Sequence, residues 1–269
     1  MPSNTEINVS QLSRLVGLPT SPVVIDVRIS EDFEVDPRLL PGSRRRDHRT
    51  VETWGPALAG RDVVVVCQKG LKLSQGVTAW LRHLGVRAES LDGGFEAWRD
   101  ASGLLAVTDH LPNTERSLWV TRARPKIDRI ACPWLIRRFV DPDAVFLYVG
   151  ASEVSSVADR FGAIAFDIEG AFWSHSEDRC TFDRMIELFG LASPALGRLA
   201  TIIRAADTAR LDLAPQAAGL LAASLGFSRI YRDDLEQLAA SLPLYDAFYR
   251  WCRDAADETH DWPPAGRAA

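Results

Sequence analysis

The chain has 269 residues, of which 46% are hydrophobic and 25% are charged, and this length favours two globular domains over one. Its net charge of −5 excludes the overall basic character of nucleic-acid-binding proteins, and no stretch approaches the ~20 consecutive apolar residues that a membrane-spanning helix needs. The four cysteines are scattered and the N-terminus has no apolar signal core, so we expect reduced thiols and a cytoplasmic protein.

Short apolar runs alternate with helical patterns in the first half of the chain. Strands are expected at residues 6–8, 23–27, 63–66 and 87–91, and the second and third of these are rich in β-branched residues. Helices are expected between them, at residues 11–16 after a Ser10 cap, at 50–58 and at 73–84. This order predicts βαβ units, and therefore an α/β fold with a parallel sheet flanked by helices.

One of these units ends in a cysteine. Residues 63–66 are all valine and lead into Cys67, a short loop with Lys69 and Lys72, and then a helix. The cysteine is thus expected at the carboxyl end of a parallel strand, facing a helix N-terminus whose N–H groups and dipole favour negative charge. Such a site favours a thiolate, so Cys67 should be the most reactive of the thiols. The alternative is a buried strand-end cysteine without chemistry.

Two charged residues close another strand of the same predicted sheet. Asp26 and Arg28 lie at its carboxyl edge, where α/β proteins bind their ligands. We therefore group Asp26 and Arg28 with Cys67 as candidate catalytic residues. The candidate substrate-binding loop after the cysteine consists of Gln68, Lys69, Gly70, Leu71 and Lys72.

Four segments of this half occur together in one order, namely Ile25–Arg28, Leu40–Ser43, Cys67–Lys72 and Leu91–Trp98. On these segments, residues 5–104 resemble a rhodanese-like (sulfurtransferase) domain. The resemblance implies that Cys67 carries a persulfide, that loop amides stabilise it, and that the partners are a sulfur donor and a thiol acceptor. The loop has the length found in sulfurtransferases. Lys69 and Lys72 stand where arginine is common in the family, which leaves the substrate open.

Residues 106–117 read as a polar linker with weak periodicity, between a first domain (1–105) and a second domain (118–269). In the second domain, strands are expected at residues 118–121, 146–149 and 164–168. Pro133 is expected in the first turn of a helix, and further helices are expected at residues 152–161, 194–206, 212–225 and 242–252. The prediction is a mostly helical α+β domain.

A basic segment opens the second domain, and a mixed set of acidic residues and a histidine follows it. The candidate anion-binding residues are Arg122, Arg124, Lys126, Arg129 and Arg204, and a solvated helix face is the alternative reading of the basic segment. The candidate metal ligands are Asp128, Glu169, His175 and Asp207. Carboxylate and imidazole ligands suit a divalent ion such as zinc, manganese or iron. The alternative for this second set is a buried salt-bridge network without metal.

Residues 118–262 resemble the C-terminal domain of the chromate-resistance ChrB family. The segments that carry the resemblance are Trp119–Arg138, Phe166–Ile168 with His175, Arg204–Thr208 and Asp212–Gly219. The resemblance implies a part in resistance to, or sensing of, chromate and other oxidants. Some relatives are described as regulators but have a different N-terminal region, so we do not carry over DNA binding, in keeping with the net charge of −5.

Two hypotheses follow for the whole chain. In the first, the protein is a sulfurtransferase whose second domain supplies a substrate or oxyanion site. In the second, it is an oxyanion- or metal-binding sensor of chromate resistance, and Cys67 is a redox-responsive or anion-responsive thiol. The sulfur acceptor and the oligomeric state stay open at this point.

Overall fold

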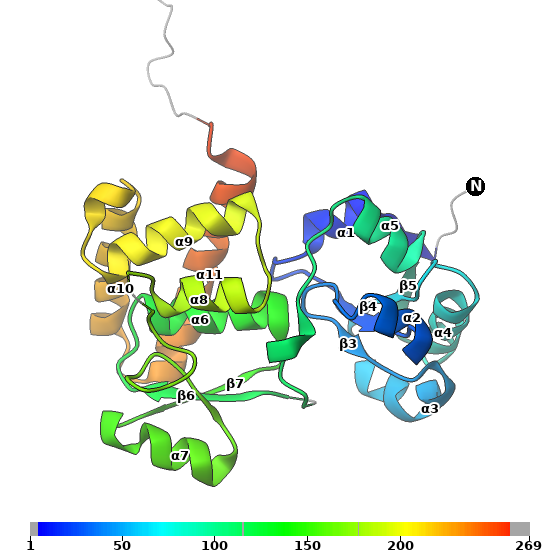
Figure 1. The fold of residues 1–269 in the computed structure, drawn as a ribbon, viewed down its shortest axis with the longest axis horizontal. Helices are drawn as coiled ribbons and strands as arrows, with labels where there is room; N and C mark the ends of the chain where they lie inside the picture. The colour runs from blue at the N-terminus through cyan, green and yellow to red at the C-terminus, as the bar shows by residue number, and fades with distance from the viewer. Residues whose placement is uncertain (1–4, 115, 177, 259–269) are drawn as a thin grey trace, which may run out of the picture.

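The computed structural model describes residues 5–114, 116–176 and 178–258. These residues form two lobes that lie side by side, each built around its own sheet (Figure 1). The α/β fold class is as predicted, with a helix-flanked parallel sheet in the first lobe and a helix-rich second lobe. Within the described ranges, no helix has both the length and the apolar character needed to cross a bilayer.

The first lobe contains a parallel sheet with the strand order β1-β5-β4-β2-β3. Its strands are β1 (Glu6–Ile7), β2 (Val23–Asp26), β3 (Arg44–Arg45), β4 (Asp62–Val66) and β5 (Arg87–Leu91). Its helices are α1 (Val9–Leu15), α2 (Ser30–Val35), α3 (Val51–Trp54), α4 (Lys72–His83) and α5 (Gly94–Asp100). The predicted Ser10 cap is wrong, because Asn8 caps α1 through a reciprocal pair of hydrogen bonds with Gln11.

The valine run of β4 is apolar throughout because the sheet is covered on both faces. Successive side chains of a strand point to opposite faces. Val64 and Val66 join the core that contains α1 and α5 residues, whereas Val63 and Val65 join the core formed with α3 and α4. The strand ends at Val66, so Cys67 is the first residue beyond it.

The second lobe has a parallel sheet in the order β7-β6-β8 and six α-helices among its described residues. Its strands are β6 (Leu118–Arg122), β7 (Val145–Val149) and β8 (Ile164–Ala165). Its helices are α6 (Asp128–Leu135), α7 (Val154–Phe161), α8 (Thr181–Leu188), α9 (Pro194–Asp207), α10 (Ala217–Ile230) and α11 (Asp234–Arg250). In Figure 1, α7 lies on one side of β6 and β7, and α6, α8 and α9 lie on the other.

The sequence predicts Pro133 in the first turn of a helix, and this prediction is wrong. The helix α6 begins at Asp128, so Pro133 lies inside it. A proline there cannot donate a backbone hydrogen bond to the carbonyl of Arg129, four residues earlier. The hydroxyl of Tyr148 on β7 donates to that carbonyl instead, at 3.2 Å. The helix therefore tolerates the proline because a neighbouring strand supplies the missing donor.

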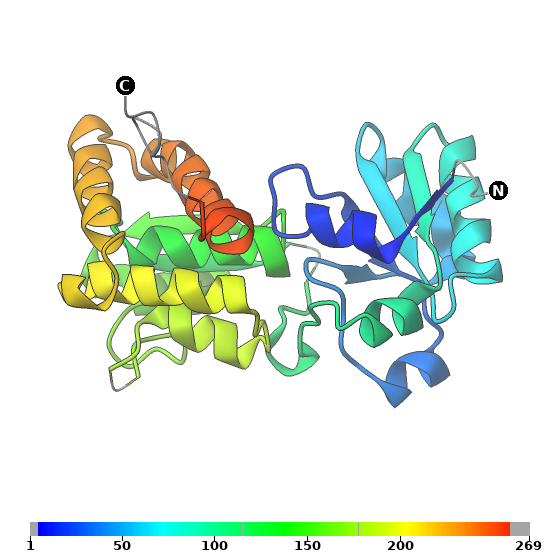
Figure 2. The ribbon, with the colours of Figure 1, turned by 90° about the horizontal axis from the view of Figure 1, so that it is seen from above.

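The two lobes share packing across the segment that joins them. One apolar core contains Leu12 and Trp98 from the first lobe together with Phe139 and Tyr249 from the second. Arg253, beyond α11, donates to the carbonyl of Val16 at the end of α1, where Figure 2 shows the two lobes facing each other.

The connecting segment takes part in this contact at its start. Ala106 is buried and pairs with Leu39, and the N–H of Val107 donates to the carbonyl of Phe189. Arg44 also forms an ion pair of 2.5 Å with Asp141 across the lobes. The domain boundary at residues 106–117 stays a prediction, and its first residues are held by both lobes.

Candidate functional site

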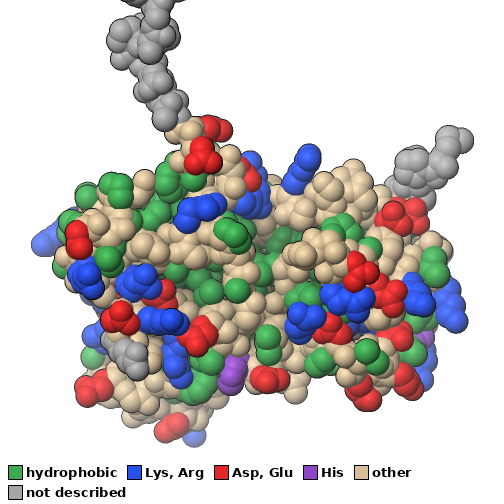
Figure 3. Space-filling model, turned by 45° about the horizontal axis from the view of Figure 1, so that its top comes forward, with side chains coloured by type: hydrophobic (Ala, Val, Ile, Leu, Met, Phe, Trp, Pro, Cys, Tyr) green, Lys and Arg blue, Asp and Glu red, His purple; other side chains and the backbone are tan. Residues whose placement is uncertain are grey.

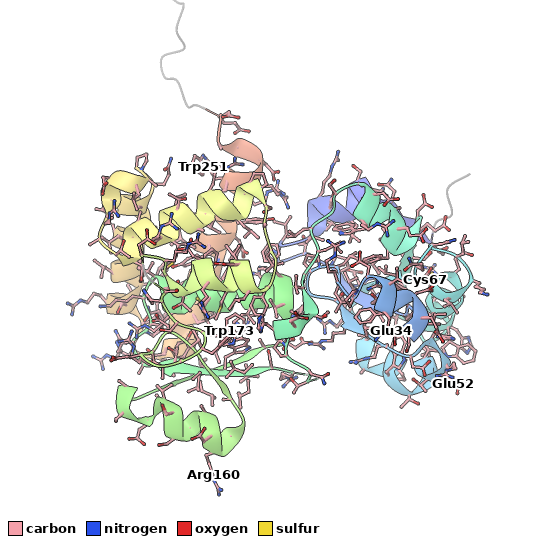
Figure 4. All side chains as sticks on the ribbon, in the orientation of Figure 1. Glu34, Glu52, Cys67, Arg160, Trp173 and Trp251 are labelled. Carbon is pink, nitrogen blue, oxygen red and sulfur yellow. The ribbon has the colours of Figure 1, made fainter. Side chains whose placement is uncertain are left out.

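Cys67 lies in the first lobe, between the end of β4 and the start of α4 (Figure 4). Its side chain is nearly enclosed, with 4% of the residue exposed. The sulfur lies 3.2 Å from the hydroxyl oxygen of Ser74, and that hydroxyl is also placed to donate to the carbonyl of Leu71. The Ser74 hydroxyl can therefore donate its hydrogen bond to the sulfur in place of the Leu71 carbonyl when the sulfur carries negative charge.

The loop after the cysteine leaves its backbone donors unused. Among the described residues, no acceptor bonds the backbone N–H groups of residues 68–74, and the first bonded one belongs to Gln75. Lys69 and Lys72 are exposed at this loop, and neither forms an ion pair with a described residue. A helix N-terminus with unused amides and added lysine charge is a favourable environment for an anion.

Two glycines allow the loop to lie directly on the turn before α5. Gly70 has φ +68, and a Cβ there would lie 2.5 Å from the carbonyl oxygen of Leu91. Gly94 has φ +61, and its Cβ would lie 2.3 Å from the carbonyl oxygen of Cys67. The N–H of Phe95 donates to that same Cys67 oxygen at 2.9 Å. The glycine pair and the α5 N-terminus therefore set the position of Cys67.

Asp26 and Arg28 form a buried ion pair of 2.7 Å whose side chains are at most 1% exposed. The arginine also donates to the carbonyls of Asp36 and Arg38, and its guanidinium lies 3.8 Å from the centre of the Phe95 ring. None of the described contacts joins either side chain to Cys67. Their predicted catalytic role stays a prediction, and the contacts they make hold the sheet edge and α5 in place.

The other cysteines are in environments that disfavour a thiolate. Burial raises the pKa of Cys132 well above its ordinary value, and burial likewise raises the pKa of Cys180. Burial raises the pKa of Cys252 to about 11. All three are completely buried, which leaves Cys67 as the thiol that combines some access with an anion-favouring loop.

A second cluster of functional groups lies in the other lobe. The Nε2 atom of His175 lies 3.0 Å from Asp167 Oδ1 and 3.6 Å from both Asp128 Oδ2 and Asp207 Oδ2. One imidazole nitrogen therefore faces three carboxylates. His175 is two residues from Trp173, which Figure 4 labels in the second lobe, so this cluster and Cys67 are in different lobes.

Residues from three separate segments meet at this cluster, which is supported by the start of α8. Asp128 begins α6 and is 1% exposed, and its two oxygens accept from the N–H groups of Thr181 and Phe182 at the start of α8. Asp167 follows β8 and has a left-handed backbone with φ +52. Asp207 is the last residue of α9, and His175 lies in the loop between β8 and α8.

The close approach of three carboxylates shifts the pKa values of the residues in the cluster. Burial, followed by the charges of Asp207 and Asp167, raises the pKa of Asp128 to about 7. The hydrogen bond to Asp167 raises the pKa of His175 to about 9. Burial and then the charge of Asp167 raise the pKa of Asp207. The carboxylates therefore favour a positive charge at the Nε2 position of His175.

The structure brings three of the four predicted metal ligands together and leaves the fourth apart, and metal binding by them stays a prediction. Asp128, His175 and Asp207 each offer a ligand atom, and these atoms lie within 4.8 Å of one another. Glu169 is exposed and has no described contact with them, because the chain turns outward after Asp167. Asp167 takes its place beside His175. The signal for it was available, since Asp167 lies near the carboxyl end of the strand predicted at residues 164–168.

The predicted anion-binding residues divide into two groups. Arg129 and Arg122 lie 3.3 Å and 3.4 Å from Asp167 Oδ2, at the cluster. Arg204 instead pairs with Asp183 at 2.7 Å. Arg124 donates to carbonyls of the segment between α10 and α11, and Lys126 lines a pocket with it on that side. The five residues therefore do not share one position in the fold, and their binding of an anion stays a prediction.

We expect the chelator-treated protein to lose stability to urea as the pH rises from 6.5 to 9. The pKa of His175 is raised from 6.5 to about 9, so its stabilising charge is fully present below pH 6.5 and is lost as the pH passes 9. The imidazole faces Asp128, Asp167 and Asp207, with Arg129 beyond. After a discount for its partial exposure, the loss should be about 1 kcal/mol.

Urea unfolding at several pH values, with His175→Ala as the comparison, measures this loss. The variant should show a flatter pH profile across this window. An unchanged slope in the variant would mean that another group carries the effect.

Each lobe matches the model of a known protein family. Residues 9–101 match the model of the rhodanese-like domain, and residues 119–252 match the model of the ChrB C-terminal domain. Protein ChrB of Cupriavidus metallidurans is 38% identical over 118 residues, which cover 43% of this chain and 35% of that protein. The chain thus spans about a third of the length of this curated relative. Both predicted resemblances are confirmed.

Solved structures of rhodanese-like proteins match about a third of this chain. A rhodanese-related protein from Thermoplasma volcanium is 22% identical, with a TM-score of 0.33, and the match covers 37% of this chain and 95% of that one. A rhodanese-like domain protein from Staphylococcus aureus is 25% identical, with a TM-score of 0.31, and the match covers 35% of this chain and 90% of that one.

Proposed function

Since this chain joins a rhodanese-like domain at residues 9–101 to a ChrB C-terminal domain at residues 119–252, we propose that it is a sulfurtransferase that acts in the response to chromate or related oxyanions. The observation that best supports the chemistry is the Cys67 loop. There, a nearly enclosed thiol begins a loop whose backbone N–H groups at residues 68–74 have no described acceptor. This arrangement suits a cysteine that carries an anionic persulfide.

The proposed reaction has two steps that return the enzyme to its starting state. The Cys67 thiolate attacks the outer sulfur of a donor such as thiosulfate, the S–S bond of the donor breaks, and sulfite leaves with the bonding electron pair. The enzyme then holds a persulfide, Cys67–S–S⁻. An acceptor nucleophile, a thiolate or cyanide, attacks the terminal sulfur and restores the Cys67 thiolate.

The surrounding residues have separate parts in this reaction. Ser74 lies 3.2 Å from the sulfur and would donate to it in the thiolate form. The unused amides and the dipole of α4 would stabilise the outer sulfur of the persulfide. Lys69 and Lys72 would attract anionic donors as point charges, without the bidentate fork of arginine. Leu71 is 57% exposed beside them and gives an acceptor an apolar contact.

A thiosulfate:cyanide sulfurtransferase assay with formation of thiocyanate as the readout tests the proposal. We expect wild-type turnover, loss of at least ~100-fold in Cys67→Ser, and near wild-type rates in the control Cys252→Ser. A side chain that forms the covalent intermediate cannot be replaced by a weaker nucleophile at pH 7. Alkylation followed by peptide mapping should label Cys67 first. Absent turnover in a folded wild-type protein, or faster labelling of Cys132 or Cys180, would overturn the assignment.

The second candidate function is an oxyanion- or metal-binding sensor, and it is supported by the charges in the other lobe. Arg122 is 44% exposed at its side chain and Arg129 lies beside it at the Asp167 carboxylate. Saturable binding of chromate or sulfate in a protein that shows no sulfur transfer would favour this reading. Loss of that binding in a combined Arg122→Met and Arg129→Met variant would locate it.

A further inference from the structure

We propose that the second lobe holds a divalent transition-metal ion between His175, Asp128 and Asp207, with Asp167 at its side. These residues come from the loop after β8, the first residue of α6 and the last residue of α9. The proposal is independent of sulfur transfer, because the cluster lies in the lobe that does not contain Cys67.

Two of the distances from His175 Nε2 fit a shared ion better than a hydrogen bond, and the third is its 3.0 Å hydrogen bond with Asp167 Oδ1. His175 Nε2 lies 3.6 Å from Asp128 Oδ2 and 3.6 Å from Asp207 Oδ2. Hydrogen bonds between nitrogen and oxygen are shorter, at about 2.7–3.2 Å. Two ligands of one tetrahedral metal with bonds of about 2.1 Å lie about 3.4 Å apart. These two separations are therefore close to those of a coordination shell.

The ligands are held in place by groups outside the cluster. Asp128 accepts from the N–H of Thr181 at 2.7 Å and from that of Phe182 at 3.1 Å, so its orientation is set by α8. Asp167 accepts from the Thr181 hydroxyl at 3.1 Å and faces Arg129 with its other oxygen. Hydrogen-bonded carboxylates of this kind are usual around metal ions in proteins.

The cluster is open to the solvent on one side. The side chain of His175 is 43% exposed and that of Asp207 is 20% exposed, whereas Asp128 is buried at the base. An ion can therefore enter past His175 and Asp207 without opening the core. It would take the place of the Nε2 proton of His175, which leaves to solvent, since a histidine ligand binds a metal as the neutral imidazole.

The donor set indicates the class of ion. One imidazole nitrogen with two or three carboxylate oxygens suits Mn²⁺, Fe²⁺ or Zn²⁺. The neighbouring thiols do not take part: Cys132 contacts Asp128 Oδ1 at 3.6 Å, and Cys180 contacts Asp183, away from His175. With three carboxylates, two arginines and a divalent ion, the loaded site would carry one net positive charge. This charge would favour an anion or an ionised water as a further ligand.

Equilibrium dialysis of the full-length protein, first treated with chelator and then exposed to Mn²⁺ or Zn²⁺ alone, tests the site. We expect stoichiometric binding and a rise of several degrees in the melting temperature with metal. His175→Ala and Asp207→Asn should weaken binding by at least ~100-fold and should abolish the metal-dependent rise. Glu169→Gln is the matched control, because it removes a nearby carboxylate that lies outside the cluster, and it should bind as the wild type does.

A spectroscopic measurement on the wild type keeps the test independent of the folding of any variant. The Mn²⁺ complex should show the ¹⁴N hyperfine coupling of a bound imidazole in pulsed electron paramagnetic resonance. Absence of stoichiometric binding of Mn²⁺, Fe²⁺ and Zn²⁺ to the wild type would overturn the proposal and leave a salt-bridge network. Binding without nitrogen coupling, or unchanged binding in His175→Ala and Asp207→Asn, would also overturn it.

Discussion

We expect Gly94→Ala to lower the free energy of unfolding by about 3 kcal/mol, from left-handed backbone strain of about 1–2 kcal/mol and a steric conflict of similar size. Gly94 has φ +61, and its Cβ would lie 2.3 Å from the carbonyl oxygen of Cys67 and 2.4 Å from the nitrogen of Gly70. Both atoms belong to the backbone of the Cys67 loop, so relief of the conflict must move that loop. Urea unfolding measures the stability loss, and sulfur transfer should fall with it.

Gly85→Ala is the matched control for this change. Gly85 has φ +80 but no heavy atom within 4 Å of its Cβ position, so only the backbone strain applies. Its loss should be about 1–2 kcal/mol. Equal losses in Gly85→Ala and Gly94→Ala would show that the close approach of α5 to the Cys67 loop contributes nothing to stability.

The second large effect is expected for Arg28→Met, at about 3–5 kcal/mol of lost stability. The change leaves the carboxylate of Asp26, which is 1% exposed, without its cation and with a backbone N–H as its described donor. It also leaves the carbonyls of Asp36 and Arg38 without their guanidinium donor. Urea unfolding of the variant at neutral pH measures the loss.

Arg38→Met provides the control, because it breaks an ion pair of the same length that is solvent-exposed. Arg38 lies 2.7 Å from Asp36 and its side chain is 45% exposed. A pair of this kind contributes about 1 kcal/mol at most. Full stability of Arg28→Met together with lost sulfur transfer would contradict the structural role and favour the catalytic role predicted for Arg28.

Local patterns in the sequence were sufficient for the fold of the first lobe and for the position of Cys67. The valine run, Cys67 and the helical pattern after it predict a strand, a loop and a helix, because each depends on neighbours in the chain. The resemblance to the rhodanese-like domain was likewise carried by short segments and is confirmed. The role of Gly94 could not be derived this way, since its Cβ would meet a loop more than twenty residues earlier in the chain.

In the second lobe, local sequence patterns do not predict where the helix that contains Pro133 begins. Pro133 favours a helix start, but Tyr148 on a neighbouring strand supplies the donor that lets the helix begin at Asp128. That pairing depends on the packing of β7 against α6, which no local pattern encodes.

The sequence by itself determined the fold class, the resemblance of each half and the position of Cys67, because these follow from periodicity and short contiguous motifs. Only the tertiary structure decided which charged residues share a site. It brings Asp167 to His175 and leaves Glu169 exposed, although the two acidic residues are two positions apart. The physical reason is the direction of the chain at Asp167. A left-handed backbone there turns its carboxylate toward α6 and α8, where the hydroxyl of Thr181 and the guanidinium of Arg129 stabilise its buried negative charge.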